Sequence, residues 1–352
     1  MMRYIFSSPY YLNERATGAN KRFECILYAL QDKHKVGIVV VKGQIPLRVN
    51  TSVSIYEIPL FIAKNRFLTF LYLNFLYLYF SLRKNVVISD FNPIPLSMFF
   101  SKKQFQLIHD ARIFNDFGRW GKLSAVLMKF QWKYIRRRIV VSQFTKDKLY
   151  DELSINPSSI IVSYNGAYAP SIDNGVSNNR EIDLLYVATF EERKNHINLV
   201  KALGLIDRPL KMTFLGRDLG LKFEIESEAS KLKHHQIIFL DAISEDKLSQ
   251  LYKNSKIFIS PSLYEGFGMP ILEAYIHGCK VLCSDLFVFH EVLAEKAVYF
   301  DPIDIENIAS VIKSSLISIK DDNSVSMHIP QEFNWLEISE KLISDISSSN
   351  FK

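Results

Sequence analysis

The stretch "KIFISPSLYEGFGMPILEAYIHGCKVLCSD", residues 256–285, holds one complete strand–helix–strand unit. An apolar run over 256–262, rich in β-branched and aromatic residues, leads into a Gly-Phe-Gly turn. A helical pattern over 270–277 then leads to a second apolar run at 281–285. Strands that are apolar almost without interruption are typical of parallel sheets covered by helices on both faces. The stretch therefore predicts part of a parallel α/β sheet.

The same alternation of short strands and amphipathic helices extends along the chain in two series. The first series has apolar runs at 3–8, 36–43, 85–91, 104–110, 138–143 and 160–166. The second adds runs at 183–190, 211–216, 237–242 and 297–302, with helical patterns at 196–204, 246–254 and 304–318. Two such series predict two Rossmann-like, doubly wound parallel-sheet domains that face an interdomain cleft.

A segment rich in serine, asparagine, glycine and proline separates the two series at 167–181. The chain of 352 residues also exceeds what one hydrophobic core usually spans. We therefore predict one domain over 1–168 and a second over 169–334. The last helix, at about 335–352, is expected to pack back on the first domain.

The composition, with 48% hydrophobic and 23% charged residues, is that of an ordinary soluble globular protein. The first residues lack an apolar run long enough for a signal peptide. Three cysteines, Cys25, Cys279 and Cys283, are too few to staple a fold of this size, which agrees with a reducing compartment. These features predict a cytoplasmic protein.

The net charge of +6 is divided unevenly between the two halves of the chain. Residues 1–165 carry 24 lysines and arginines against 10 acidic residues, so the remainder of the chain is acidic overall. A basic half attracts polyanions such as nucleic acid, anionic lipid headgroups or phosphate-bearing ligands. Composition alone does not choose among these partners.

The Gly-Phe-Gly turn carries a glutamate on each side and leads into the predicted helix. Pro270 suits a first helical position, where the free N–H groups and the positive end of the helix dipole favour a diphosphate. Glu273, predicted in the first turn, is placed to accept hydrogen bonds from a ribose diol, and Glu265 to hold hydroxyls of a second sugar. The plainer interpretation is that Glu273 complements the helix dipole and the glycines turn the chain.

Two other strand ends carry candidate residues. Arg193 and Lys194 follow the strand at 183–190, where adjacent cations suit a diphosphate, although a solvated loop of mixed charge is the alternative. His109 closes the strand at 104–110, a position where a lone histidine is more often structural. Gly18 precedes the first predicted helix and is by itself a weak signal.

Several classes of protein lose support from missing motifs. No GxGxxG follows either first strand and no Walker lysine loop is present, which disfavours dinucleotide oxidoreductases and P-loop NTPases. A zinc site from His277, Cys279, Cys283 and His290 is disfavoured because the cysteines flank and enter a predicted buried strand. No Asp-x-Asp triplet is present to hold Mg²⁺, so we expect no metal and no cofactor.

The motifs together resemble a GT-B glycosyltransferase of family 4, which is marked by Glu-x7-Glu. The C-terminal motif is "SLYEGFGMPILEAYIHGCKVLCSD", with "VATFEERKNH" upstream and "IHDARIF" in the first half. The resemblance extends over nearly the whole chain, through segments such as "FNPIPL", "VVSQFTKDKL", "IVSYNGA" and "FDPID". It implies an acceptor-binding first domain and a nucleotide-sugar-binding second domain.

The resemblance also implies a mechanism and residue roles. A hexose passes with retention from a nucleoside diphosphate sugar to an acceptor hydroxyl, and the leaving phosphate oxygen takes the acceptor's proton. Glu273 holds the donor ribose, Arg193 and Lys194 bind the phosphates, and His109 lies by the donor sugar. The remaining donor-binding positions that it implies are Gly18, Glu265, Gly266, Phe267, Gly268 and Met269. Catalysis is expected of His109, Glu265, Arg193 and Lys194.

The sequence departs from the family pattern at two positions. Family members often have two or three glycines in the first loop, whereas only Gly18 is present here, which puts the fit of that loop in doubt. Glu192 stands where a proline is frequent, and we expect that change to be tolerated. Glu291 matches a family glutamate of uncertain role.

Two segments raise the question of membrane contact. The uncharged core of 64–84, Phe67 to Leu82, spans about 24 Å as a helix, which is short of the hydrocarbon layer, so it is expected to be buried or interfacial. The segment 119–138 predicts a helix whose basic and aromatic residues suit an anionic membrane surface. A helix that packs on the core and exposes a charged face is the alternative. The apolar face consists of Leu123, Val126, Leu127, Phe130 and Tyr134, with Lys122, Lys129, Lys133 and Arg136 elsewhere.

The sequence thus predicts a cytoplasmic hexosyltransferase, with mannose-like sugars favoured, at the inner face of the cell membrane. Its expected partners are a GDP-, UDP- or dTDP-linked sugar and a glycan or polyprenyl-diphosphate-linked acceptor of bacterial surface polysaccharide (O-antigen or capsule) synthesis. The alternatives are a nucleotide sugar epimerase, a glycan phosphorylase or a non-catalytic glycosyltransferase-like subunit. A nucleic-acid partner is not expected, because no recognition motif is present.

Overall fold

The computed structural model describes residues 3–13, 17–114, 122–167, 180–319 and 329–349. The chain divides into two compact units, of which the first is Met1–Gly166 with Gln331–Lys352 and the second is Ala167–Pro330. Most of the predicted boundary segment 167–181 lies outside the described residues. The start of the predicted helix 119–138 lies outside them as well.

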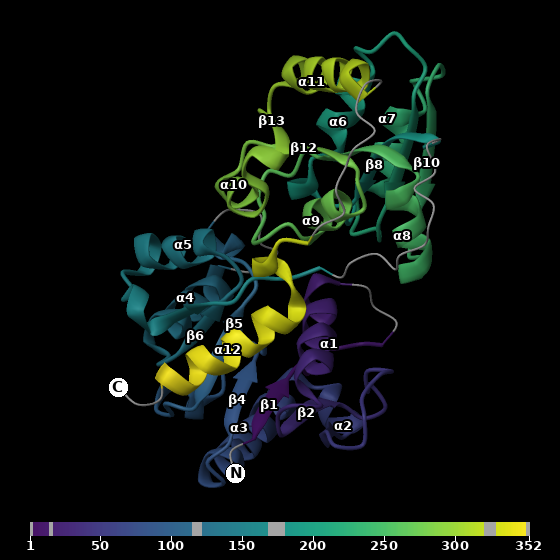
Figure 1. The fold of residues 1–352 in the computed structure, drawn as a ribbon. Helices are drawn as coiled ribbons and strands as arrows, with labels where there is room; N and C mark the ends of the chain where they lie inside the picture. Colours follow the sequence, from purple (N-terminus) through teal and green to yellow (C-terminus); the bar gives the residue numbers. More distant parts are fainter. Residues whose placement is uncertain (1–2, 14–16, 115–121, 168–179, 320–328, 350–352) are drawn as a thin grey trace. The chain divides into compact units, whose positions relative to one another are not determined.

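The first unit contains a seven-stranded parallel sheet in the order β3-β2-β1-β4-β5-β6-β7 (Figure 1). Its strands are β1 (Tyr4–Ser7), β2 (Val36–Val41), β3 (Ser54–Ile58), β4 (Val86–Ser89), β5 (Gln104–Ile108), β6 (Arg138–Val140) and β7 (Ile160–Val162). The central strands are fully buried, as expected of a sheet covered on both faces.

Helices cover this sheet, and their caps follow from the local sequence. They are α1 (Gly18–Leu30), α2 (Leu60–Ala63), α3 (Arg66–Leu82), α4 (Lys122–Tyr134), α5 (Gln143–Leu153) and α12 (Trp335–Ser349). The side chains of Thr17, Asn65 and Ser142 accept hydrogen bonds from first-turn N–H groups of α1, α3 and α5. The C-terminal helix α12 lies along α1 and also contacts β7 (Figure 1).

The second unit contains a six-stranded parallel sheet in the order β10-β9-β8-β11-β12-β13. Its strands are β8 (Ile182–Val187), β9 (Lys211–Leu215), β10 (Gln236–Leu240), β11 (Ser255–Ser260), β12 (Lys280–Ser284) and β13 (Ala297–Phe300). Its helices are α6 (His196–Leu203), α7 (Lys222–Ala229), α8 (Glu245–Lys253), α9 (Met269–Ile276), α10 (Phe287–Leu293) and α11 (Ile305–Ser318).

The predicted fold class is confirmed, since each predicted apolar run contains a parallel strand. One strand was missed. β3 is an edge strand that pairs with β2, and half-buried and exposed residues alternate along it, so it lacks the continuous apolar run by which the others were recognised.

Each sheet has a point at which the strand order reverses, and ligands of open α/β sheets bind beyond the strand ends at such points. In the first unit the reversal lies at β1, between β2 and β4. In the second unit it lies at β8, between β9 and β11. The loops after β8 and β11 are therefore the place to search for a site in the second unit.

Candidate functional site

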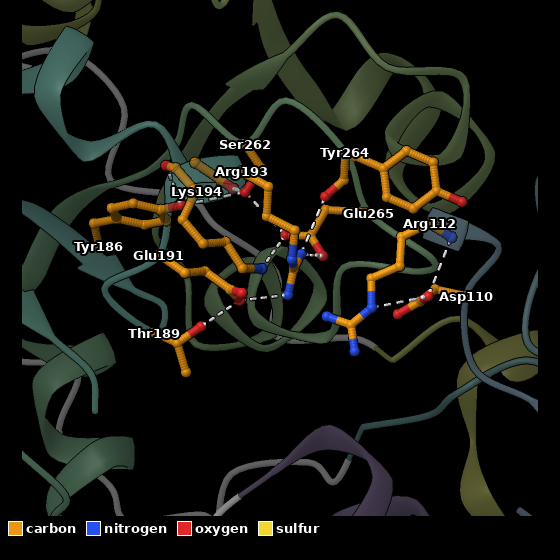
Figure 2. A network of polar contacts seen from close by, with 11 residues as sticks. Asp110, Arg112, Tyr186, Thr189, Glu191, Arg193, Lys194, Ser262, Tyr264 and Glu265 are labelled. Atoms are coloured by element: carbon orange, nitrogen blue, oxygen red, sulfur yellow. Dashed lines mark hydrogen bonds and ion pairs between the residues drawn. The ribbon is translucent and has the colours of Figure 1, made fainter. Parts of the chain in front are cut away.

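The loops after β8 and β11 meet in a network of charged side chains (Figure 2). Arg193 Nη1 lies 3.3 Å from Glu265 Oε2, and Arg193 Nη2 lies 2.8 Å from Glu191 Oε1. Lys194 Nζ forms a short ion pair with Glu265 Oε1, which also accepts a hydrogen bond of 2.9 Å from Ser262. The structure thus brings together Arg193, Lys194 and Glu265, three of the residues predicted from sequence.

Backbone and buried side chains fix the two loops against each other. The N–H of Leu263 donates to the carbonyl of Arg193 at 2.8 Å, and the hydroxyl of Tyr186 donates to the carbonyl of Lys194 at 2.8 Å. Asn195 adopts a left-handed conformation, with φ of 56°, that ends the short 3₁₀ turn Glu192–Lys194 before α6 begins. The cations are therefore held by a defined backbone rather than by a solvated loop.

The electrostatics of the network keep Glu265 charged. Burial favours the neutral form of this carboxyl, but Lys194 and Arg193 outweigh burial and lower its pKa to about 2. Burial lowers the pKa of Lys194, while Glu265 acts in the opposite direction. With Glu191 included, two carboxylates pair with two cations. An anionic ligand must therefore either displace one of these carboxylates from its cation or bind beside the existing ion pairs.

Helix α9 begins after a turn that requires glycine. Gly268 caps the helix in the left-handed region, with φ of 92°, and a Cβ there would lie 2.6 Å from the ring of Phe289. Met269 is consequently the first helical residue. Pro270, which was predicted to be the first, is the second, so the helix begins one residue earlier than predicted. Packing against Phe289 therefore explains why residue 268 is a glycine, whether or not a ligand also requires it.

Glu273 lies in the second turn of α9, not in the first turn as predicted. Its distance from the helix end removes the interpretation that it only complements the helix dipole, because that effect is confined to the first turn. The side chain is 8% exposed, and its Oε2 accepts a hydrogen bond of 3.1 Å from the hydroxyl of Tyr252. An ionised carboxylate can accept several hydrogen bonds at once.

The remaining candidates, Gly18 and His109, belong to the first unit. Gly18 is the exposed first residue of α1. His109 follows β5, and its Nε2 lies 3.8 Å from Asp90 Oδ2, which also accepts a hydrogen bond of 3.0 Å from Ser8. Sequence reasoning missed Asp90, although its place at the end of a buried strand was the same signal that identified His109.

The cysteines and histidines considered for zinc have other contacts. The Cys279 thiol donates to the carbonyl of Tyr252 at 3.0 Å, and His277 Nε2 lies 2.9 Å from Ser249 Oγ. His290 Nε2 lies 2.6 Å from Asp285. Within the described ranges, no three His, Cys, Asp or Glu side chains are grouped as metal ligands would be.

The first unit also exposes apolar helix faces. The side chains of the predicted apolar face of α4 are exposed. Met128 and Trp132, on another face of the same helix, pack into the core instead. On α3, Leu73, Tyr77 and Phe80 are buried, whereas Phe75 is 75% exposed. The other exposed apolar residues of these helices are Phe67, Leu68, Leu71, Leu78, Tyr79, Leu82, Leu123, Val126, Leu127, Phe130 and Tyr134. No helix in the described part of the chain is long and apolar enough to cross a bilayer.

Residues 171–326 match the family model described as "Glycosyl transferases group 1". O-antigen chain mannosyltransferase B of Escherichia coli is 31% identical over 139 residues, which cover 38% of this chain and 36% of that protein. O-antigen chain mannosyltransferase RfbU of Salmonella typhimurium is 27% identical over 246 residues, which cover 66% of this chain and 65% of that protein. The chain thus spans less than two thirds of either curated relative.

The whole fold also has counterparts among solved structures. Anabaena HepE, solved in complex with UDP and glucose, superposes with a TM-score of 0.70 over 99% of this chain and 100% of that chain. The two sequences are 14% identical, so this likeness concerns the fold. It extends over both units, beyond the part matched by the family model.

Proposed function

We propose that this chain, whose residues 171–326 match the group 1 glycosyl transferase model and whose two units have the GT-B fold, is a retaining, metal-independent glycosyltransferase. The donor is a nucleoside diphosphate sugar, and the acceptor is a hydroxyl group of a glycan. The observation that carries this proposal is the buried network of Arg193, Lys194 and Glu265, which lies where the strand order of the second sheet reverses.

The network supplies what the leaving group of such a reaction needs. Negative charge builds on the departing diphosphate, and preorganised cations in a buried site stabilise that charge strongly. Arg193 and Lys194 meet this need, together with the N-terminal end of α9. The leaving phosphate oxygen takes the proton of the acceptor hydroxyl, so the mechanism requires no separate protein base. His109 assists at the sugar.

The second glutamate of the pair holds the nucleoside. Glu273 accepts hydrogen bonds from the ribose diol, whereas Glu265 and the turn Gly266–Phe267–Gly268–Met269 position the sugar and diphosphate. The two glutamates thus divide the donor between them, one directly before the turn that Gly268 makes possible and one in the second turn of the helix that follows it. Gly18, the first residue of α1, contacts the donor or the acceptor.

The sugar is mannose or a close relative, and the product is a bacterial surface polysaccharide. The support for both comes from the curated relatives, which are named as O-antigen chain mannosyltransferases. The donor is linked to GDP, UDP or dTDP. The acceptor carries a polyprenyl diphosphate lipid.

The enzyme works in the cytoplasm, on the inner face of the cell membrane. The support is the exposed apolar face of α4, with Lys129 and Lys133 on the same helix, together with the exposed face of α3. Sedimentation with vesicles of anionic phospholipid tests this. The wild type is expected in the pellet and the Phe75→Ser/Phe130→Ser variant in the supernatant. Equal sedimentation of the two proteins, or no sedimentation of the wild type, would refute the membrane role.

Calorimetry with a panel of nucleoside diphosphates and their sugars tests the donor site. Lys194→Ala and Glu273→Ala are each expected to weaken binding of the preferred nucleoside diphosphate by at least about tenfold, because each removes a charged partner of the ligand. His109→Ala should lower turnover more than affinity. The matched control is Lys201→Ala, which removes an exposed lysine of α6. Unchanged nucleotide affinity in both of the first two variants would refute the assignment.

A further inference from the structure

Tyr252 reaches from one helix to the carboxylate of another. It lies near the end of α8, the helix that precedes β11, and Glu273 lies in α9, the helix that follows β11. The tyrosine hydroxyl donates to Glu273 Oε2 at 3.1 Å. The two side chains are 1% and 8% exposed, so this hydrogen bond is made in a buried environment.

The surroundings restrict how Tyr252 and Glu273 can move. The ring of Tyr252 lies against the ring of His277, with centroids 5.2 Å apart. His277 Nδ1 in turn lies 2.7 Å from the carbonyl oxygen of Glu273, and the Cys279 thiol donates to the carbonyl of Tyr252. Both the side chain and the backbone of Glu273 are therefore contacted by residues that also contact each other.

We propose that Tyr252 is a positioning residue, whose hydroxyl fixes one oxygen of Glu273 so that the carboxylate is oriented toward the ribose diol of the donor. The inference rests on the proposed function, in which Glu273 binds that diol. A glutamate side chain has three rotatable bonds, and fixing it before the ligand arrives lowers the entropy cost of binding. Burial and the neighbouring Glu273 raise the pKa of Tyr252 well above its ordinary value, so the hydroxyl remains a donor at neutral pH.

A purely structural role would have different consequences. If Tyr252 only filled space and satisfied a buried carboxylate, its loss would affect stability, or the binding of all nucleotides equally. If it orients Glu273 toward the ribose, its loss should matter only for ligands with ribose hydroxyls. The comparison between a ribonucleotide and its 2′,3′-dideoxy analogue therefore separates the two roles.

The experiment is calorimetry on the full chain with the preferred nucleoside diphosphate and its 2′,3′-dideoxy analogue. Tyr252→Phe is expected to weaken binding of the ribonucleotide by about tenfold and to leave the dideoxy analogue unchanged. The matched control is Tyr299→Phe, which removes a hydroxyl that donates to backbone carbonyls of Phe289 and Ala294 in the same unit. It should leave the ratio of the two affinities as in the wild type.

Two further measurements separate the possible failures. Glu273→Ala should also abolish the preference for the ribonucleotide. If it does not, the proposed ribose role of Glu273 fails, whereas discrimination lost in Glu273→Ala but kept in Tyr252→Phe overturns only the role of Tyr252. Should Tyr252→Phe not fold, 3-fluorotyrosine at position 252 keeps the shape and alters the acidity of the hydroxyl. Equal changes for both nucleotides would then overturn the proposal.

Discussion

In each unit, the segment that follows the first strand carries a buried cation, and the two cations have different kinds of partner. After β8, Lys194 pairs with the carboxylate of Glu265. After β1, the guanidinium of Arg22 in α1 is 1% exposed and donates to three neutral acceptors. These are Ser163 Oγ at 2.8 Å, the carbonyl of Tyr164 at 2.6 Å and Asn165 Oδ1 at 2.9 Å.

The difference indicates two uses of a buried charge. A cation paired with a carboxylate can exchange that partner for a phosphate, because both present negatively charged oxygens that accept charge-assisted hydrogen bonds. A cation bonded to neutral groups of one chain segment instead fixes that segment. Arg22 thus holds residues 163–165, the last residues of the first unit before Gly166, whereas Lys194 has a partner that an anionic ligand can replace. Burial lowers the pKa of Arg22 to about 9, so its charge is maintained at a cost to the fold.

The largest expected effect is a loss of stability when Arg22 is replaced. Arg22→Met removes three hydrogen bonds and leaves their acceptors buried, which should lower the free energy of unfolding by about 3 kcal/mol, as measured by urea denaturation. The control Arg48→Met removes an exposed arginine of the same unit and should change the free energy by less than about 0.5 kcal/mol. If Arg22→Met were as stable as the control, Arg22 would not fix the segment.

An effect of similar size, which depends on pH, is expected at Glu265. The pKa of Glu265 falls from its ordinary 4.5 to about 2 in the folded chain, so its contribution to stability is fully present above pH 4.5 and is lost as the pH falls through 2. A shift of this size corresponds to about 3 kcal/mol. The difference in unfolding free energy between the wild type and Glu265→Gln should therefore shrink between about pH 5 and pH 2.

The control for that measurement removes a carboxylate from the surface. Glu306 is exposed in α11, and the difference between the wild type and Glu306→Gln should stay within about 0.5 kcal/mol across the same pH range. A difference for Glu265→Gln that is constant with pH would mean that the carboxylate draws no stability from Lys194 and Arg193.

The fold could be predicted from sequence because continuous apolar runs report burial on both faces of a strand. β3 was missed, since an edge strand is half exposed and needs only alternation. The burial of Arg22 could also have been predicted. Arg22 stands three and four residues before Cys25 and Ile26, so it lies on the apolar face of its helix.

The candidate site could be predicted in its residue types but not in its contacts. Sequence placed Arg193, Lys194 and Glu265 after strands, whereas their mutual pairing depends on which strands are neighbours and on side-chain conformations. The one-residue error at Pro270 arose because the helix start is set by the left-handed conformation of Gly268. The space beside Gly268 is filled by Phe289, twenty-one residues further along the chain, which a local pattern does not report.

Residue 268 also limits how this protein can be altered. Since a side chain there would meet both an unfavourable backbone conformation and the ring of Phe289, we expect most substitutions at that position to destabilise the fold. A library intended to change the proposed sugar preference should therefore keep glycine at 268 and diversify its neighbours. New specificities would then be selected from variants that still fold.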